Sequence, residues 1–191
     1  MTTSQPASKR GRWSNGELPA NVRLGENTIV TADYAFKRFH SVRDPGLTVG
    51  DNSTMDGVHF AVGADAVVKI GSFCYFTNAV VLSEESITIG DYVVIGWNAT
   101  IADTDFHPLD PAQRVADAIA CSPLGGGRAR PPIARRPVVI EDDVWIGPNA
   151  TILKGVRIGA GSFIEPGALV TQDVPPGSRV LGNPAQIVGS V

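Results

Sequence analysis

The chain has 191 residues, of which 43% are hydrophobic and 18% are charged, and its formal net charge is −3. This size and composition are typical of one globular domain with a sizeable core, and the 21 glycines and 14 prolines favour a fold with many corners. The slight acidity excludes a general attraction to nucleic acid or to an anionic membrane surface, and no apolar run approaches the roughly 18 residues that a membrane-spanning helix needs.

Residues 1–20 are predicted to form a flexible polar arm. This segment carries three basic residues but no apolar stretch of the kind found in secretory signals. Cys74 and Cys121 show neither the spacing of a metal site nor that of a disulfide framework. We therefore expect a cytoplasmic protein whose folded domain covers residues 21–191.

Apolar residues recur at intervals of six through most of this domain. The period fits neither a helix of 3.6 residues per turn nor a long alternating strand, so the chain must coil and present one face repeatedly. The anchor residues of the repeat are Leu24, Val30, Phe36, Val49, Met55, Ile70, Phe76, Leu82, Ile89, Ile95, Ile101, Ile140, Ile146, Ile152, Ile158, Ile164 and Val170. Stacked coils of this kind bury a continuous aliphatic column, which predicts an all-β fold, a parallel β-helix.

Glycine follows many of the anchors, as in Leu24-Gly25, Ile70-Gly71 and Ile146-Gly147. Glycine tolerates positive φ and brings no side chain to a crowded corner, so these positions are expected to make the sharp bends between short strands. The period by itself does not determine the hand of the coil.

The repeat is interrupted once, by an excursion at about residues 103–137. A long structureless segment in a regular solenoid is uncommon unless it serves binding or catalysis. The excursion must project outward because the inside of the coil is already filled. We therefore expect it to reach a neighbouring molecule or to cover a groove, which favours an oligomer with sites between subunits.

His107 opens this excursion and has three aspartates near it in sequence. An imidazole titrates near neutral pH and can take a proton from a hydroxyl or an amine. A histidine in a loop is also often only structural or exposed, so the residue alone leaves both interpretations open. His40 and His59 lie near irregular corners and are interpreted as structural.

Three segments resemble the hexapeptide-repeat acyltransferases. They are Val144-Trp145-Ile146-Gly147, the turn at residues 171–176, and Gly182-Asn183-Pro184-Ala185. Over residues 20–188 the chain is most similar to the branch that holds maltose, galactoside and nodulation acetyltransferases and the O-acetyltransferases of surface polysaccharides. The resemblance implies a left-handed β-helix, a homotrimer, three active sites between adjacent subunits, and acetyl-CoA lying along one edge of the coil.

The resemblance also assigns roles to individual residues. His107, followed by a proline, matches the family's catalytic histidine, which acts as a general base without an acyl-enzyme and without a metal. The expected acceptor-binding residues are Glu84, Asn78 and Asp105. The expected donor-binding residues are Trp145, Gly147, Gly167, Thr171, Gln172 and Gln186. Trp145 would form a wall of the pantetheine channel or pack at the trimer contact, and the adjacent acids at 84 and 85 are equally consistent with a solvated corner.

The chain departs from the family pattern at four positions. Gln172 and Gln186 stand where relatives commonly carry a cation for the CoA phosphates, and an amide brings no charge. Pro148 and Pro166 have no backbone N–H that could donate a hydrogen bond to the acyl donor. The returning half of the excursion contains four arginines, and of these Arg135 and Arg136 are expected to bind CoA phosphates or an anionic acceptor such as a nucleotide-linked sugar, unless the run is only solvated.

The leading expectation is therefore CoA-dependent acetyl transfer to a hydroxyl of a sugar or glycan. An amino-sugar N-acetyltransferase would use the same base. A zinc enzyme of the γ-class carbonic anhydrase type shares the coil but needs three clustered histidines, and here the three are separated by 19 and 48 residues. A β-helix scaffold that has lost its donor site is the remaining alternative, supported by the four departures. The sequence does not identify the acceptor or the length of the acyl chain.

Overall fold

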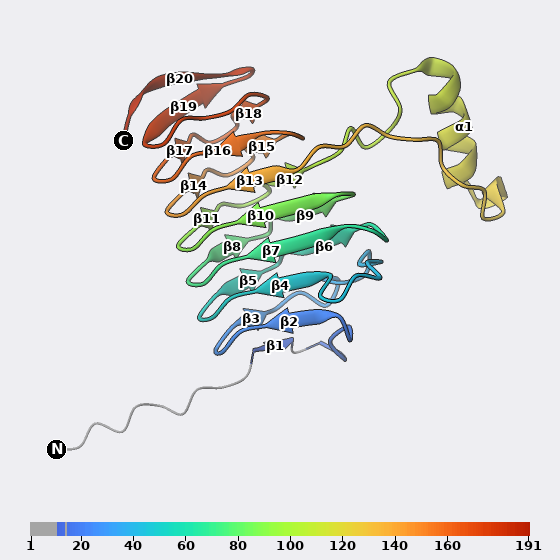
Figure 1. The fold of residues 1–191 in the computed structure, drawn as a ribbon, viewed down its shortest axis with the longest axis horizontal. Coiled ribbons are helices and arrows are strands. Elements are labelled where there is room, and N and C mark those ends of the chain that lie inside the picture. The colour runs from blue at the N-terminus through green and yellow to red at the C-terminus, as the bar shows by residue number, and fades with distance from the viewer. Residues whose placement is uncertain (1–10, 14) are drawn as a thin grey trace.

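The computed structural model describes residues 11–13 and 15–191, and it confirms the parallel β-helix (Figure 1). Each regular coil contributes one short strand to each of three sheets, so the coil is three-sided. The first face holds β2 (Val22–Leu24), β4 (Leu47–Val49), β7 (Val67–Ile70), β10 (Ser86–Ile89), β13 (Val138–Ile140) and β16 (Arg157–Ile158). The third face holds β6 (His59–Val62), β9 (Val80–Ser83), β12 (Thr100–Ala102), β15 (Thr151–Ile152) and β18 (Leu169–Val170).

The second face is the longest, because both ends of the coil add strands to it. It holds β1 (Arg12–Trp13), β3 (Ile29–Val30), β5 (Thr54–Asp56), β8 (Tyr75–Thr77), β11 (Val94–Ile95), β14 (Trp145–Ile146), β17 (Phe163–Ile164), β19 (Ser178–Gly182) and β20 (Ala185–Ser190). All these pairings are parallel except that of β19 with β20, which ends the coil as an antiparallel hairpin.

The coil winds to the left. In Figure 1 the first face is toward the viewer and its strands point left, while successive coils rise from the N-terminus to the C-terminus. The chain visits the first, second and third faces in that order, as in β4, β5 and β6. This is the hand that the family resemblance implies.

The six-residue repeat marks the inside of the coil. Apart from Leu24 and Leu82, every predicted anchor is at most 8% exposed, and most are fully buried. Leu82 was expected in the column, but the side chain that points inward there is Val81, because Val81 aligns with Ile101 while Leu82 aligns with Ala102. Leu82 is half-buried on the outer surface of the third face.

The glycines that follow the anchors serve close packing rather than positive φ. The left-handed corner residue comes three positions after the anchor, as at Asn52 (φ 55°), Tyr92 (φ 59°) and Asp143 (φ 57°). Gly71 instead lies against the next coil, where a Cβ would come within 2.6 Å of the Gly90 carbonyl carbon. These glycines lie in the turns between the strands, as predicted, but the physical reason for glycine there is the close approach of neighbouring backbones.

The N-terminal part of the coil extends into the segment predicted as an arm. β1 pairs in parallel with β3, and the Trp13 ring packs edge-on against Phe36 with centroids 4.9 Å apart. Residues 1–10 and 14 of the predicted arm lie outside the described residues. Among the described residues, no helix is long and apolar enough to cross a membrane.

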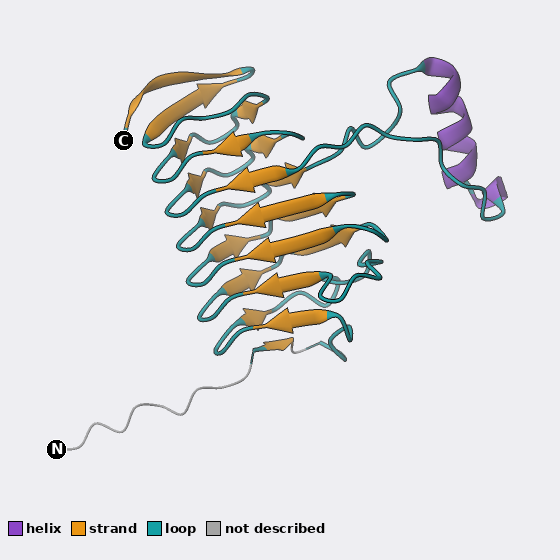
Figure 2. Cartoon of the chain, in the orientation of Figure 1, coloured by secondary structure: helices purple, strands orange, loops and turns teal. Residues whose placement is uncertain are grey.

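The excursion leaves the coil after β12 and returns at β13. Its outgoing and returning strands pair at the base, where the Asp105 amide donates to the Ala134 carbonyl (3.0 Å) and the Arg136 amide donates to the Asp103 carbonyl (2.8 Å). Part of the predicted loop is helical: α1 (Pro111–Cys121) is followed by a short 3₁₀ turn, η1 (Pro123–Gly125). Figure 2 shows α1 standing away from the coil at the end of this stem.

We predict that Gly71→Ala lowers the free energy of unfolding by about 1–3 kcal/mol, because the added methyl group overlaps the next coil. Gly189→Ala is the matched control, since a Cβ there meets nothing within 4 Å, and it should change stability by less than about 1 kcal/mol. Denaturant unfolding of both variants measures this. Equal effects would mean that close packing of the coils does not require glycine at position 71.

Candidate active site

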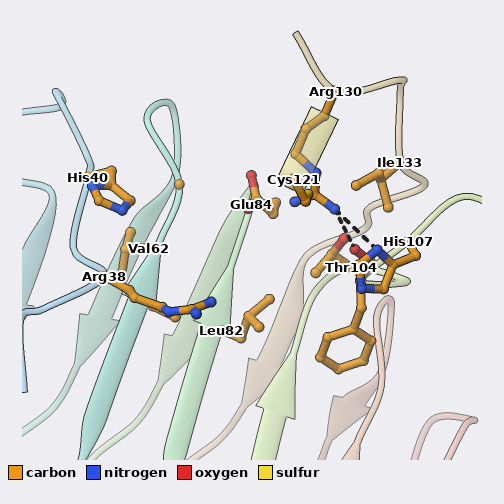
Figure 3. A pocket seen from close by; sticks show the side chains of 13 residues that line it. Arg38, His40, Val62, Leu82, Glu84, Thr104, His107, Cys121, Arg130 and Ile133 are labelled. Atoms are coloured by element: carbon orange, nitrogen blue, oxygen red, sulfur yellow. Dashed lines mark hydrogen bonds between the residues drawn. The ribbon is translucent and has the colours of Figure 1, made fainter. Parts of the chain in front are cut away.

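A cleft of about 500 Å³ lies where the third face turns into the first, beneath the excursion. We call this edge of the coil the excursion corner; it comprises residues 63–66, 84–85, 103–137, 153–156 and 171–173 in successive coils. Figure 3 shows the cleft with its principal side chains, which are Arg38, Leu82, Glu84, Thr104, His107 and Arg130. The cleft therefore contains the predicted base and one predicted acceptor-binding residue.

His107 is held by a carboxylate from α1. Its Nδ1 lies 2.5 Å from Oδ2 of Asp117, and its side chain is 59% exposed. An ionised carboxylate can only accept, so Nδ1 must donate, and in the neutral ring Nε2 is then the nitrogen without a proton. The backbone leads into this position through Phe106, which has φ of 65°, and the His107 amide donates to the Asp105 carbonyl (2.7 Å).

Asp117 is fully buried and is bound from two sides. Nε of Arg130 donates to its Oδ1 (2.6 Å), and Nη2 of Arg130 donates to its Oδ2 (3.1 Å) and to the Phe106 carbonyl (2.9 Å). The hydrogen bonds from Arg130 and then from His107 hold the pKa of Asp117 well below its usual range, while Asp117 raises the pKa of Arg130. The carboxylate therefore stays ionised and fixes the ring of His107.

Asp117 has no feature in the sequence that marks it as a site residue. The residue sits between two alanines in the stretch that forms α1, and it is the only buried residue of that helix. No spacing rule links it to His107, because the contact depends on how the stem of the excursion places the helix.

Asp103 shapes the opposite side of the cleft. Its buried carboxylate accepts hydrogen bonds from the Ser83 hydroxyl (2.7 Å) and from the amides of Glu84 (2.7 Å) and Glu85 (3.0 Å). These bonds fix the corner from which the Glu84 side chain extends. Gly63 makes room for it, since a Cβ at that position would lie 2.4 Å from Oε2 of Glu84.

The carboxylate of Glu84 is half-buried and accepts no hydrogen bond from any described residue. It faces the cleft in Figure 3. A buried or half-buried carboxylate gains free energy when it accepts hydrogen bonds, so Glu84 is available to bind a hydroxyl or an amine of a ligand.

The other two predicted acceptor residues do not line the cleft. Asp105 lies at the excursion corner but forms an ion pair with Lys154. Asn78 lies at the corner between the second and third faces. Its backbone N–H donates to the Asp56 carbonyl (2.6 Å), and its side chain occupies the space above Gly57.

Three of the predicted donor-binding residues come together. Thr171, Gln172 and Gln186 line a hollow of about 210 Å³ between the last coil and the C-terminal hairpin. The first two belong to the excursion corner, two coils beyond the stem of the excursion. At the usual strand spacing, two coils correspond to about 10 Å along the axis.

The remaining predicted donor residues lie elsewhere. Trp145 is on the outer surface of the second face and stacks on Phe163 with centroids 4.2 Å apart. The amide of Gly147 donates to the Ile164 carbonyl (2.8 Å) and that of Gly167 to the Pro148 carbonyl (2.9 Å), so both N–H groups are used between coils. Gly147 is required by packing, since a Cβ there would lie 2.6 Å from the Pro166 nitrogen.

The side chains of the two arginines expected to bind phosphate both contact other parts of the chain. Nη1 of Arg135 donates to the Glu84 carbonyl (2.8 Å), and the residue lines a second hollow of about 390 Å³ that shares Glu84 and Arg130 with the main cleft. The side chain of Arg136 lies against Gly155.

Several residues interpreted as structural, or not singled out, line the cleft. His40 and Arg38 project into it from the irregular segment between β3 and β4, and Cys121 lines it from the end of α1. His59 lies outside it; its Nε2 is buried without a hydrogen bond, and burial followed by the charges of Arg38 and Lys37 lowers its pKa. Within the described ranges, no group of three His, Cys, Asp or Glu side chains is placed to hold a metal ion.

We predict that Asp117→Asn loosens the excursion in a pH-dependent way. A carboxylate whose folded pKa is lowered stabilises the fold above its unfolded pKa near 3.9 and loses this effect as the pH falls toward the folded value. Amide hydrogen exchange of α1 should therefore be faster in the variant at neutral pH, and the difference in opening free energy should shrink below about pH 4. A difference that persists unchanged at pH 2 would contradict this role of Asp117.

A known family model matches the C-terminal half of the coil. The family described as "Bacterial transferase hexapeptide (six repeats)" matches residues 137–172. A 2,3,4,5-tetrahydropyridine-2,6-dicarboxylate N-acetyltransferase from Staphylococcus aureus (strain JH9) is 56% identical over 62 residues, which is 32% of this chain. The match covers 26% of that protein, so the chain spans about a quarter of the length of this curated relative.

Two solved structures resemble the chain over most of its length. A hexapeptide-repeat acetyltransferase from Vibrio cholerae O1 biovar eltor, complexed with acetyl coenzyme A, is 34% identical with a TM-score of 0.59, over 83% of this chain and 75% of that one. A galactoside acetyltransferase in complex with coenzyme A is 26% identical with a TM-score of 0.57, over 76% of this chain and 64% of that one. With its left-handed coil, its repeat and these similarities, the chain belongs to the hexapeptide-repeat acyltransferase family.

Proposed function

We propose that the protein transfers an acetyl group from acetyl-CoA to a hydroxyl of a sugar or glycan, with His107 as the general base. The observation that carries this proposal is the pairing of His107 with the buried Asp117 in a cleft that also holds Glu84, whose carboxylate accepts no hydrogen bond from a described residue. The two solved relatives bind coenzyme A or acetyl coenzyme A, which supports the choice of donor.

The mechanism follows from the positions of these groups. Glu84 accepts a hydrogen bond from the acceptor, and Nε2 of His107 takes the proton of the attacking hydroxyl as its oxygen bonds to the thioester carbonyl carbon. The carbon–sulfur bond then breaks, and the imidazolium returns the proton to the departing thiolate. Asp117 stays ionised throughout and stabilises the charged ring.

The donor is proposed to lie along the excursion corner. The hollow lined by Thr171, Gln172 and Gln186 belongs to the same edge as the stem that carries His107. A donor that extends over these coils would bring its thioester toward the cleft. Arg135 lines the adjoining hollow, and we propose that its guanidinium nitrogens not bound to the Glu84 carbonyl meet a phosphate of the donor.

The proposal includes a cytoplasmic homotrimer. The His107 ring is 59% exposed, so a second subunit can approach the open side of the cleft without displacing Asp117. In that arrangement Trp145 and Asn78, which lie away from the cleft of their own chain, are available to a neighbour's site.

N-acetylation is the second candidate. The identity to an N-acetyltransferase from Staphylococcus aureus over 62 residues favours it, and the same base can take a proton from an amine. A scaffold without activity is supported by Gln172 and Gln186, but the ordered network of Asp117, Arg130 and His107 argues against it.

Replacement of His107 by alanine tests the proposal. Release of free thiol from acetyl-CoA with a panel of sugars and amino sugars should fall by about 10²-fold to 10⁴-fold in kcat. His40→Ala is the matched variant, since this second histidine also lines the cleft, and it should cost less than about tenfold. Unchanged turnover in His107→Ala, or an equal loss in His40→Ala, would contradict the assignment of the base.

Asp117→Asn should lower kcat by about 10²-fold to 10⁴-fold and leave KM for the acceptor nearly unchanged. An asparagine amide would donate to Nδ1 and favour the tautomer whose Nε2 carries the proton. Glu85→Gln, which removes an exposed acid at the neighbouring corner, is the control. If only KM changes in Asp117→Asn, the carboxylate does not act through the ring.

Glu84→Gln should raise KM for the acceptor by about tenfold with a smaller effect on kcat, because an amide is a weaker hydrogen-bond acceptor than a carboxylate. Initial rates over a range of acceptor concentrations measure this. A loss of CoA affinity in the same variant would move Glu84 from the acceptor site to the donor site.

A further inference from the structure

Most cationic groups around the cleft are already paired. Arg130 is bound to Asp117, and Arg135 donates to the Glu84 carbonyl. Arg38 differs, because its guanidinium makes no hydrogen bond or ion pair with any residue that the structure describes. Figure 3 shows its side chain reaching into the cleft from the side opposite His107.

The backbone under Arg38 is well ordered by its neighbours. The Val62 amide donates to the Arg38 carbonyl (3.1 Å), the His40 amide donates to the Val62 carbonyl (2.8 Å), and Phe39 bridges Val62 in parallel. Residues 38–40 therefore continue the third face as a further strand would. Phe39 packs on Phe36, with centroids 6.0 Å apart, so the segment is also fixed from inside.

This pairing places Arg38 on the floor of the cleft. Because Phe39 aligns with Val62, Arg38 continues the outward row that contains Ala61, Leu82 and Ala102. Ala61 is small and leaves the arginine side chain free to lie along the row toward Leu82. Three strand spacings, about 14 Å, separate its backbone from Ala102, where the excursion begins.

Three polar groups of the cleft, each from a different coil, follow one another beside this row. Arg38 is at one end, the free carboxylate of Glu84 lies between, and His107 is at the other end. An unpaired guanidinium binds carboxylate or phosphate strongly and through two parallel hydrogen bonds. An acceptor that fills the cleft would thus meet a cation at the end away from the reacting atom.

We propose that the acceptor carries an anionic group, a phosphate or a carboxylate, and that Arg38 binds it. This inference rests on the proposed function for the identity of the reacting end. Glu84 then holds the hydroxyl or amine beside His107, and Arg38 selects acceptors that have the negative charge at the far end. Neutral sugars would bind less tightly because the guanidinium stays unpaired.

The test compares sugars with and without an anionic group at carbon 6. The pairs are glucose and glucose 6-phosphate, glucosamine and glucosamine 6-phosphate, and galactose and galacturonate. The wild-type protein should prefer at least one member that carries the anionic group, and Arg38→Gln should raise KM for it by about tenfold or more while KM for the member without that group changes little. Arg128→Gln is the matched control, since it removes an equal charge from an exposed part of the excursion.

Calorimetric titration separates this inference from the proposed function. Each anionic probe and CoA is titrated into wild-type protein and Arg38→Gln. Binding of an anionic probe that is lost in Arg38→Gln, with no turnover in either protein, would support the anion site and contradict acetyl transfer. Turnover with equal KM of acceptors that have and lack the anionic group would support acetyl transfer and contradict the anion site.

Two outcomes overturn the role of Arg38. If no anionic probe binds the wild-type protein more tightly than Arg38→Gln, the cleft has no anion site at this residue. If Arg38→Gln weakens CoA instead, the arginine belongs to the donor. The expected result is unchanged CoA affinity in this variant.

Discussion

The buried carboxylate of Asp117 is the constraint on which the site depends. A charge without exposure to water is costly unless it is fully paired, and here Arg130 and His107 together supply the pairing. The same contacts join α1 to the stem of the excursion. One interaction therefore orders the excursion, fixes which nitrogen of His107 faces the cleft, and keeps the charge that stabilises a protonated ring.

The regular coil supplies the rest of the site at little structural cost. Its excursion corner repeats in every turn, so residues that are far apart in sequence lie along one edge. Asp103 is the first residue of the excursion, and its carboxylate accepts three hydrogen bonds from the corner one coil below, which contains Glu84. Thr171 and Gln172 come to the same edge two coils above. The proposed order of acceptor, base and donor along the edge thus follows from the winding.

Much of the fold could be predicted from the sequence, because a period of six has one physical interpretation and the buried isoleucines obey it. The error at Leu82 arose because five residues, rather than six, separate the buried Phe76 from the buried Val81, and only the pairings with Ile95 and Ile101 show this. The site was harder to predict. His107 and Glu84 were assigned through the family resemblance, whereas Asp117 and Arg38 reach the cleft through the stem of the excursion and through an irregular segment that no spacing rule describes.

The tautomer of His107 tests the central claim most directly. Nitrogen-15 NMR of the imidazole distinguishes a protonated from an unprotonated ring nitrogen in the neutral form. We predict that Nδ1 carries the proton, which it donates to Asp117 in a hydrogen bond, and that Nε2 is unprotonated and available as a base. A neutral ring with its proton on Nε2 would contradict the account, because the nitrogen facing the cleft could then not accept a proton from the acceptor.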